Sequence, residues 1–175
     1  MPKRVVRHAV EQPQDQSIRR IPLTQGQHTT VDASDYDWLM RHNWHARRKQ
    51  WGFYATRNVP LPDGRQTTVD MHREILGLKF GATPTGDHIN RDTLDNRRAN
   101  LRLATASQQV MNQGVRVDSS TGYRGVTQRG NKWRAKINLD GKQISLGYGS
   151  TPEEVHALYR AAAEKYFGEY AGVQV

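Results

Sequence analysis

The sequence contains no cysteine, and this absence excludes disulfide bonds and zinc sites built on cysteine thiolates. No apolar run approaches the roughly 20 residues that a membrane-spanning helix needs. The basic N-terminus also lacks the apolar core of a signal peptide. We therefore expect a protein without a membrane partner, whose domains are stabilised by packing alone.

Acidic side chains are also few in comparison with basic ones. The 175 residues include 17 Asp and Glu against 26 Lys and Arg, which gives a formal net charge of +9. A balance this basic favours a polyanionic partner, and nucleic acid more often than an anionic membrane surface. The length suits one medium domain or two small ones.

The most informative stretch runs from Asp87 to Asn112 and has the sequence DHINRDTLDNRRANLRLATASQQVMN. Asp87 carries a hard oxygen ligand of the kind that Mg²⁺ accepts. His88 is the side chain best suited to take a proton near neutral pH. A carboxylate, an imidazole and downstream amides on a basic chain indicate metal-assisted hydrolysis of phosphodiester bonds.

The segments before this stretch predict a small antiparallel sheet with two short helices. Strands are expected within residues 21–31, and at residues 51–57 and 65–69, which flank a Pro-Asp-Gly turn. Helices are expected at residues 35–41 and 71–78. Residues 1–20 show no periodicity and predict a mobile arm.

From residue 87 onwards, the sequence predicts strands and helices in two groups. The stretch at residues 87–112 predicts a strand at 87–90, a polar loop, a strand at 101–104 and a helix. Beyond a linker, three strands are expected at residues 123–128, 132–139 and 143–148, because Gly-containing turns separate them. A helix capped by Ser150 or Thr151 should then run to Gly168. Its expected apolar stripe consists of Val155, Leu158, Tyr159, Ala162 and Tyr166.

The Asp-His pair, the spacing from His88 to Asn100 and the LDN-RR-x-NLR run resemble the HNH homing-endonuclease family, whose core is a ββα-metal finger. A Met-His-Arg element at residues 71–73 also resembles this family. The resemblance implies that His88 is the general base and that Asp87 holds Mg²⁺ or Mn²⁺. It also implies that Asn100 ties down the loop and thereby fixes the geometry of His88.

The resemblance leaves the second metal ligand open. The family normally has an asparagine on the finger helix where this sequence has Gln109, whose extra methylene moves the amide oxygen and adds a torsion. Asn112 lies about one turn further along the same helix face and is the alternative ligand. If the site has decayed at Gln109, the chain is a DNA-binding protein without nuclease activity.

Basic side chains around this site are candidate contacts to DNA phosphates. His72 and Arg73 either contact the scissile phosphate or brace their own helix. The arginines of the finger are expected at phosphates rather than on a solvated face, and they are Arg91, Arg97, Arg98 and Arg102.

Residues 119–172 resemble the APETALA/ethylene-response-factor type of DNA-binding domain, through YRGV at residues 123–126, KW at 132–133, LG at 146–147 and TPEE at 151–154. The middle strand alternates cationic and apolar residues, so one face should be basic and the other should pack on an Ala-rich helix. The resemblance implies DNA contacts from Arg124 and Arg129, and the cationic face adds Arg134 and Lys136.

The sequence therefore predicts an α+β protein: an arm at residues 1–20, an HNH nuclease domain at 21–113 with its finger at 86–113, a linker at 114–121 and a DNA-binding domain at 122–172. The nuclease finger should follow a small antiparallel sheet, and a three-stranded sheet on one helix should end the chain. The expected activity is metal-dependent nicking or cutting of double-stranded DNA by a monomer or homodimer. The family resemblance implies a cytoplasmic protein of a bacterial or phage-infected cell.

Overall fold

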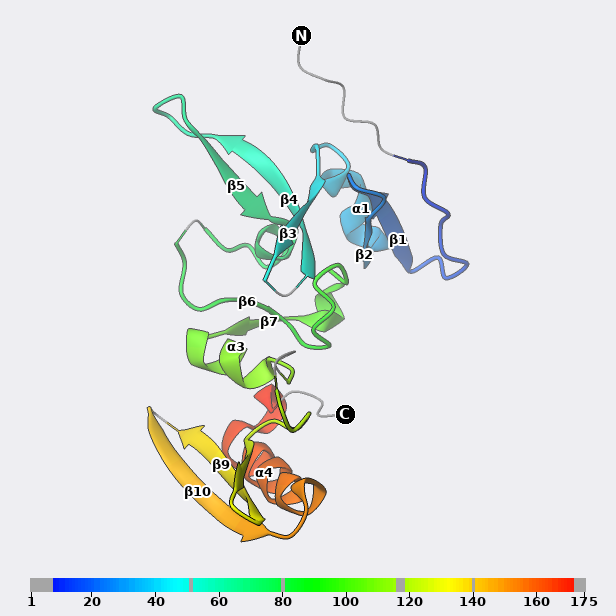
Figure 1. Ribbon diagram of the computed structural model, residues 1–175. Coiled ribbons are helices and arrows are strands. Elements are labelled where there is room, and N and C mark those ends of the chain that lie inside the picture. Colours follow the sequence, from blue (N-terminus) through cyan, green and yellow to red (C-terminus); the bar gives the residue numbers. More distant parts are fainter. Residues whose placement is uncertain (1–7, 51, 80, 116–118, 140, 172–175) are drawn as a thin grey trace. The chain divides into compact units, whose positions relative to one another are not determined.

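The computed structural model describes residues 8–50, 52–79, 81–115, 119–139 and 141–171. The protein is mixed α+β, as predicted, with small antiparallel sheets and short helices (Figure 1). It divides into two compact units, residues 1–106 and 107–175. The division falls inside the expected nuclease finger, so nearly all of helix α3 (Ala106–Asn112) belongs to the second unit.

The first unit opens with a hairpin of β1 (Ile18–Pro22) and β2 (His28–Asp32). Gln25 and Gly26 both have positive φ at its turn. Residues 18–20, expected in the arm, therefore lie in a strand, and the Gln12 side chain bonds both backbone polar groups of Arg20 at 2.9 Å. Helix α1 (Ala33–Leu39) follows directly and begins two residues earlier than expected.

A three-stranded sheet comes next, in the order β3-β4-β5. The predicted hairpin is confirmed, since β4 (Gly52–Pro60) and β5 (Gln66–Asp70) flank the Pro-Asp-Gly turn. Strand β3 (His45–Lys49) was not predicted, because its HARRK sequence has little apolar alternation. Pairing with β4 alone makes this polar segment a strand. Backbone pairing with β4 thus outweighs the weak β-strand propensity of residues 45–49.

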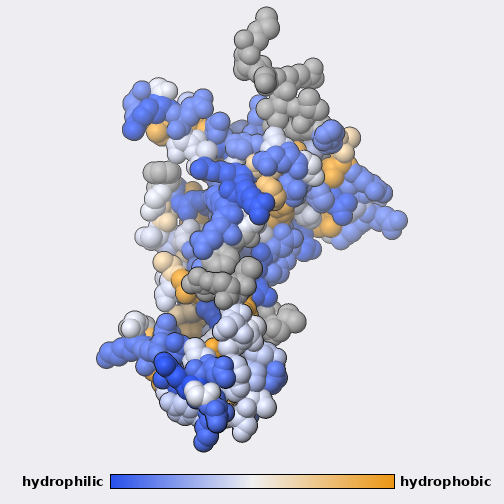
Figure 2. Space-filling model, in the orientation of Figure 1, coloured by the Kyte–Doolittle hydropathy of each residue, from blue (hydrophilic) through white to orange (hydrophobic). Residues whose placement is uncertain are grey.

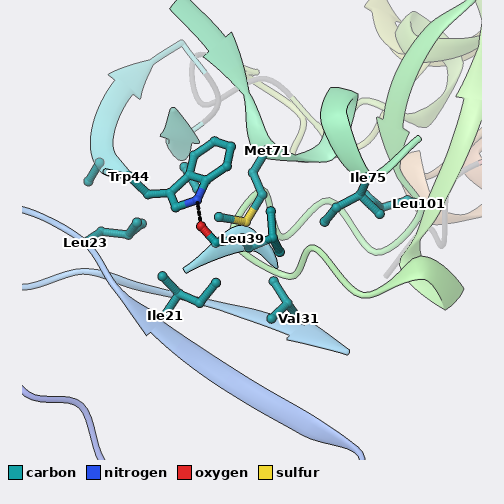
Figure 3. Close-up of a cluster of buried hydrophobic side chains, with 10 residues drawn as sticks. Ile21, Leu23, Val31, Leu39, Trp44, Met71, Ile75 and Leu101 are labelled. Carbon is teal, nitrogen blue, oxygen red and sulfur yellow. Dashed lines mark hydrogen bonds between the residues drawn. The ribbon is translucent and has the colours of Figure 1, made fainter. Parts of the chain in front are cut away.

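Helix α2 (Met71–Ile75) starts where β5 ends, and its apolar residues anchor it in the core of the first unit. Figure 3 shows Met71 beside Trp44 and Leu39, and Trp44 Nε1 donates a 2.8 Å hydrogen bond to the Leu39 carbonyl. Met71 and Ile75 are both buried. Because this anchoring fixes the rotation of α2, it also fixes the direction of His72.

The finger strands pair as predicted. Strand β6 (Thr85–His88) lies antiparallel to β7 (Leu101–Ala104), which follows a short 3-10 helix at Arg98–Asn100. β6 ends at His88, two residues before the expected end. Arg91 has a positive φ of 67°, a turn conformation that ends extended pairing.

In the second unit, β8 (Val126–Arg129), β9 (Lys132–Leu139) and β10 (Lys142–Gly149) form a sheet ordered β10-β9-β8 (Figure 1). Helix α4 (Pro152–Phe167) packs on it and a 3-10 turn at Gly168–Tyr170 follows. The predicted cap is confirmed, because the Thr151 hydroxyl accepts a 3.2 Å bond from the Glu154 N–H. Ala135 and Ile137 are buried against α4, so the predicted two-faced middle strand is confirmed.

The predicted apolar stripe of α4 is partly wrong. Leu158 and Tyr166 are 41% and 43% exposed. His156, Ala163 and Phe167 are buried in their place. Sequence periodicity allowed several overlapping stripes, and tertiary packing selected the one whose small Ala163 permits a close approach to the sheet.

Hydrophilic residues dominate the face of the protein seen in Figure 2, and hydrophobic ones form only small separate spots. No helix in the part of the chain that the structure describes has the length and apolar character needed to cross a membrane.

Candidate active site

The predicted base, His88, is the last residue of β6, and only 5% of it is exposed. Its ring lies edge-on to that of His72, with centroids 4.9 Å apart, and edge-on to Tyr54 at 6.1 Å. These three rings come from β6, α2 and β4. The structure therefore brings His88 of the Asp-His motif into contact with His72 of the Met-His-Arg element. In the sequence, only the family resemblance connected that element with the motif.

A glycine makes this convergence possible. A Cβ at Gly86 would lie 2.5 Å from Cδ2 of His72 and 3.0 Å from Cδ1 of Leu76. Gly86 and His88 are alternate residues of β6, so both face α2. The absence of a side chain at Gly86 lets the His72 ring lie directly against the strand, next to the His88 ring.

Burial controls the protonation of both histidines. It lowers the pKa of His72 well below 6.5, and repulsion between protonated His72 and the cationic groups His88, Lys49 and Arg73, His88 only when it is itself protonated, lowers it further. Burial also lowers the pKa of His88, although the bond to Asn96 and the carboxylates of Asp87, Asp92 and Asp95 oppose this effect. Both imidazoles are therefore neutral at pH 7, the state in which a histidine can accept a proton.

Asp87 lies opposite Arg102 in the β6–β7 pair, and its Oδ2 accepts a 3.0 Å bond from Arg102 Nε. Both side chains are largely buried. A carboxylate offers about four acceptor sites, so an ion pair and a metal ligand can coexist on one group. Mg²⁺ is typically held by one or two carboxylates and retains several waters. The donor chemistry of Asp87 fits such an ion.

Asn100 holds the loop between the two strands. Its Oδ1 accepts from the Asn90 N–H at 2.9 Å, and its Nδ2 donates to the Asp95 carbonyl at 2.8 Å. The Asn100 carbonyl also accepts from the Ile89 N–H at 2.9 Å. One buried amide thus ties both sides of the loop together next to His88.

Most of the cations expected at phosphates make contacts inside the protein. Arg97 and Arg98 form two-pronged ion pairs with Asp95 and Asp35, respectively. Arg73 donates to Thr85 Oγ1 at 2.9 Å and to the Lys79 carbonyl at 2.8 Å, which favours its bracing role. Arg91 is exposed on the loop.

The predicted residues of the second unit lie in two places. Gln109 and Asn112 are on α3, with Gln109 half-buried and Asn112 buried. The identity of the second metal ligand stays a prediction. Among the described residues, no group of three or more His, Asp or Glu side chains could hold a metal ion by itself.

Arg124 was expected at DNA bases, but its guanidinium donates to the backbone carbonyls of Val110, Met111 and Gln113. It thereby covers the C-terminal end of α3, where helix carbonyls lack intrahelical partners. Arg129 is exposed at the end of β8, and Arg134 and Lys136 are half-buried on β9. These three side chains come from neighbouring strands of one sheet.

Tyr54, Thr29 and Asn96 are site residues that the sequence did not indicate. Tyr54 contacts both histidine rings, and burial raises its pKa, as do Asp70 and Asp87. Asn96 Oδ1 lies 3.2 Å from Nε2 of His88, and Thr29 bonds Asn96 in turn. Asn96 stands inside the LDN-RR run, so its position in the motif was the one available signal.

Comparisons with known proteins cover the segment that contains the centre of this site. Residues 69–111 match the HNH endonuclease family. The matched segment contains His72, Asp87, His88, Asn96 and Asn100 and ends before residues 119–172, so it gives no support to the resemblance of the C-terminal part to plant DNA-binding domains. No solved structure is significantly similar to the chain.

Two viral proteins are similar to the chain. A protein of Acanthamoeba polyphaga mimivirus, described as an uncharacterized HNH endonuclease, is 32% identical over 107 residues, which cover 59% of this chain and 56% of that protein. The chain thus spans about half the length of this relative. Protein 3.8 of Escherichia phage T7 is 27% identical over 105 residues, which cover 57% of this chain and 86% of that protein.

Proposed function

We propose that this protein is a metal-dependent HNH endonuclease that hydrolyses phosphodiester bonds of double-stranded DNA. The family match and the name of the mimiviral relative support a nuclease in general. The observation that carries the proposal is the buried imidazole of His88, placed beside Asp87 under a loop that Asn100 holds in place.

In the proposed reaction, His88 takes a proton from the attacking water. Asn100 holds the loop in place and thereby fixes the orientation of the imidazole. Asp87, together with Gln109 or Asn112, would hold Mg²⁺ or Mn²⁺. When bound, such an ion supplies positive charge for the phosphorane and for the leaving 3′-oxygen. His72 and the exposed Arg91 are the proposed phosphate contacts closest to this chemistry, and the products carry 5′-phosphate and 3′-hydroxyl ends.

The sheet of the second unit is the proposed platform for DNA. Arg129, Arg134 and Lys136 lie on its strands, while the acids Glu153, Glu154 and Glu164 lie on α4 behind it. This separation of charge would direct the sheet towards phosphates. The resemblance to ethylene-response-factor domains points the same way. Arg124 is left out of the proposed contacts, because it binds the end of α3.

The second candidate is a DNA-binding protein whose nuclease site has decayed. Gln109 stands where the family has an asparagine, and Arg102 already pairs with the carboxylate of Asp87. Both features would weaken the binding of a metal ion. In either case we propose a protein that acts in the cytoplasm of a bacterial or phage-infected cell. The active nuclease would nick one strand as a monomer or cut both strands as a homodimer.

Plasmid nicking tests the proposal. Supercoiled DNA is incubated with the wild-type protein and Mg²⁺, Mn²⁺ or EDTA, and with His88→Ala. We expect metal-dependent nicks in the wild type and a loss of about 10²–10⁴-fold in His88→Ala, the usual contribution of a general base. His42→Ala, which changes an exposed histidine, is the matched control and should nick normally.

Ligation of the nicked product checks the proposed ends, because DNA ligase requires a 5′-phosphate and a 3′-hydroxyl. Binding of DNA by the wild type without any nicking in Mg²⁺ or Mn²⁺ would contradict the nuclease and favour the second candidate.

A further inference from the structure

A chain of hydrogen bonds runs from the β1–β2 hairpin to the ring of His88. The Thr29 hydroxyl lies 2.7 Å from the Leu94 carbonyl, Asn96 Nδ2 lies 2.7 Å from Thr29 Oγ1, and Asn96 Oδ1 lies 3.2 Å from His88 Nε2. Thr29 and Asn96 are 0% and 1% exposed, so water does not compete for these groups.

The chemistry of the first link fixes the direction of the whole chain. The Leu94 carbonyl can only accept, so the single hydroxyl hydrogen of Thr29 goes to it. Thr29 Oγ1 must then accept from Asn96, and this requires the NH₂ end of the amide to face Thr29. The carbonyl end of Asn96 therefore faces His88. Because that oxygen can only accept, Nε2 of the neutral imidazole carries the hydrogen.

The surrounding backbone holds the relay in place. The Thr30 N–H donates to the Leu94 carbonyl at 2.9 Å, and the Asn96 N–H donates to the Thr30 carbonyl at 2.8 Å. Thr30 and Asp95 also form a parallel β-bridge. The loop that follows His88 is thus docked on β2, far away in the sequence, and this docking fixes the backbone positions from which Thr29 and Asn96 reach each other.

We propose that Thr29 and Asn96 are positioning residues that hold His88 in its Nε2–H tautomer, so that Nδ1 carries the lone pair that takes the proton of the attacking water. The tautomer follows from the hydrogen bonds alone, while the role of Nδ1 as a base rests on the proposed nuclease function. The N-terminal hairpin, outside the segment that matches the HNH endonuclease family, would then be part of the catalytic apparatus.

Two substitutions at one position separate the hydroxyl from the shape of Thr29. Thr29→Val keeps the shape and removes the hydroxyl, so Asn96 loses the partner that sets its direction. Thr29→Ser keeps the hydroxyl and removes a methyl group. The ring nitrogens of the ¹⁵N-labelled full-length proteins are then observed by NMR at a pH where His88 is neutral, and a His88→Gln spectrum identifies the His88 signals.

We expect a protonated Nε2 and an unprotonated Nδ1 for His88 in the wild type and in Thr29→Ser, and a mixed or reversed pattern in Thr29→Val. In the plasmid assay, kcat of Thr29→Val should fall by about 10-fold, the effect of one lost hydrogen bond, with KM unchanged. Thr29→Ser should restore most of the rate. A role in folding alone would not move the tautomer.

The outcomes are distinguishable from those of the nuclease test. A wild-type His88 protonated on Nδ1, or a Thr29→Val protein with the wild-type tautomer and kcat, would overturn the inference even if the protein nicks DNA. The reading of the wild-type spectrum does not depend on whether either Thr29 variant folds. Conversely, the expected tautomers in a protein that never nicks DNA would support the relay and contradict the nuclease.

Discussion

Individual arginines have partners in the structure that differ from those that the sequence predicts. Arg98 stands in a basic run that suggests phosphate contacts. In the fold its Nε and one terminal nitrogen donate to the carboxylate of Asp35, each at 2.8 Å. Asp35 is buried in α1, whereas the Arg98 side chain is 57% exposed. This arginine therefore neutralises a buried acid of the first unit and still reaches solvent.

Replacing Arg98 should destabilise the first unit. Arg98→Met leaves the Asp35 carboxylate buried without its charged partner, and we expect the free energy of unfolding to fall by about 1.5–3 kcal/mol at pH 7. Arg65→Met is the matched control, because Arg65 and Asp63 form an exposed pair at a hairpin turn, and it should cost about 0–1 kcal/mol. Urea denaturation of both variants measures the difference, and equal values would contradict a structural role for Arg98.

The contribution of this pair also has a defined pH range. Burial raises the pKa of Asp35, but the bonds from Arg98 and Trp38 outweigh it and hold the pKa below 3.8. A carboxyl whose folded-state pKa is depressed contributes stability above its unfolded pKa and loses it as the pH falls through the folded value. In Arg98→Met, burial raises the pKa of Asp35, so the unpaired carboxyl takes up a proton at a higher pH than in the wild type. The gap between wild type and Arg98→Met should therefore be full near neutral pH and shrink as the pH falls towards and through 3.8.

Among the elements, helix α4 packs closely against the residue just before β8. Gly125, just before β8, has a φ of +72°, and a Cβ there would lie 2.2 Å from the Tyr159 ring and 2.7 Å from the Lys136 carbonyl. The Lys136 N–H also donates to the Gly125 carbonyl at 2.8 Å. The glycine is needed both for its backbone conformation and for the space it leaves to Tyr159 of α4.

Gly125→Ala should therefore destabilise the second unit by roughly 2–5 kcal/mol, the sum of a positive-φ penalty and overpacking. Gly130→Ala is the control. Gly130 also has a positive φ, of +60°, but nothing lies within 4 Å of its added Cβ, so this variant should lose only about 1–2 kcal/mol. Thermal unfolding followed by near-UV circular dichroism compares the two. A loss no larger in Gly125→Ala would show that the Tyr159 contact yields without strain.

At the scale of the whole molecule, the two compact units divide the proposed work. The first contains the Asp-His motif and its supporting loop, and the second contains the cationic sheet. Because α3 belongs mostly to the second unit and Met111 packs in its core, a truncation after residue 114 would cut through that unit. Substitution is therefore a better test of the sheet than deletion.

Removing two cations from the sheet should weaken the salt dependence of DNA binding. For Arg129→Gln with Lys136→Gln, we expect the slope of log K against log salt concentration to become shallower by up to about 1.8, because each phosphate contact contributes about 0.9. Arg160→Gln with Lys165→Gln removes the same charges from exposed positions of α4 and should leave the slope nearly unchanged. Fluorescence anisotropy at several salt concentrations measures both. Equal slopes in the two double variants would exclude the sheet as the DNA contact.

The sequence by itself determined most of the elements and the centre of the site. Turn glycines, caps and alternation are local signals, and they placed the β4–β5 hairpin, the finger strands, α3 and the three strands before α4 within a few residues. Asp87, His88 and Asn100 were predicted because they lie close together in one motif, and the structure does bring them together around one loop.

Only the tertiary structure decided what surrounds that centre. Tyr54 and His72 reach His88, and Thr29 reaches Asn96, from elements far away in the sequence. These contacts depend on how the β1–β2 hairpin, β4 and α2 pack. The same holds for the arginines, since no local pattern shows that a carboxylate such as Asp35 will lie buried nearby. Local propensity specifies elements, whereas side-chain partners, tautomer and burial depend on long-range packing.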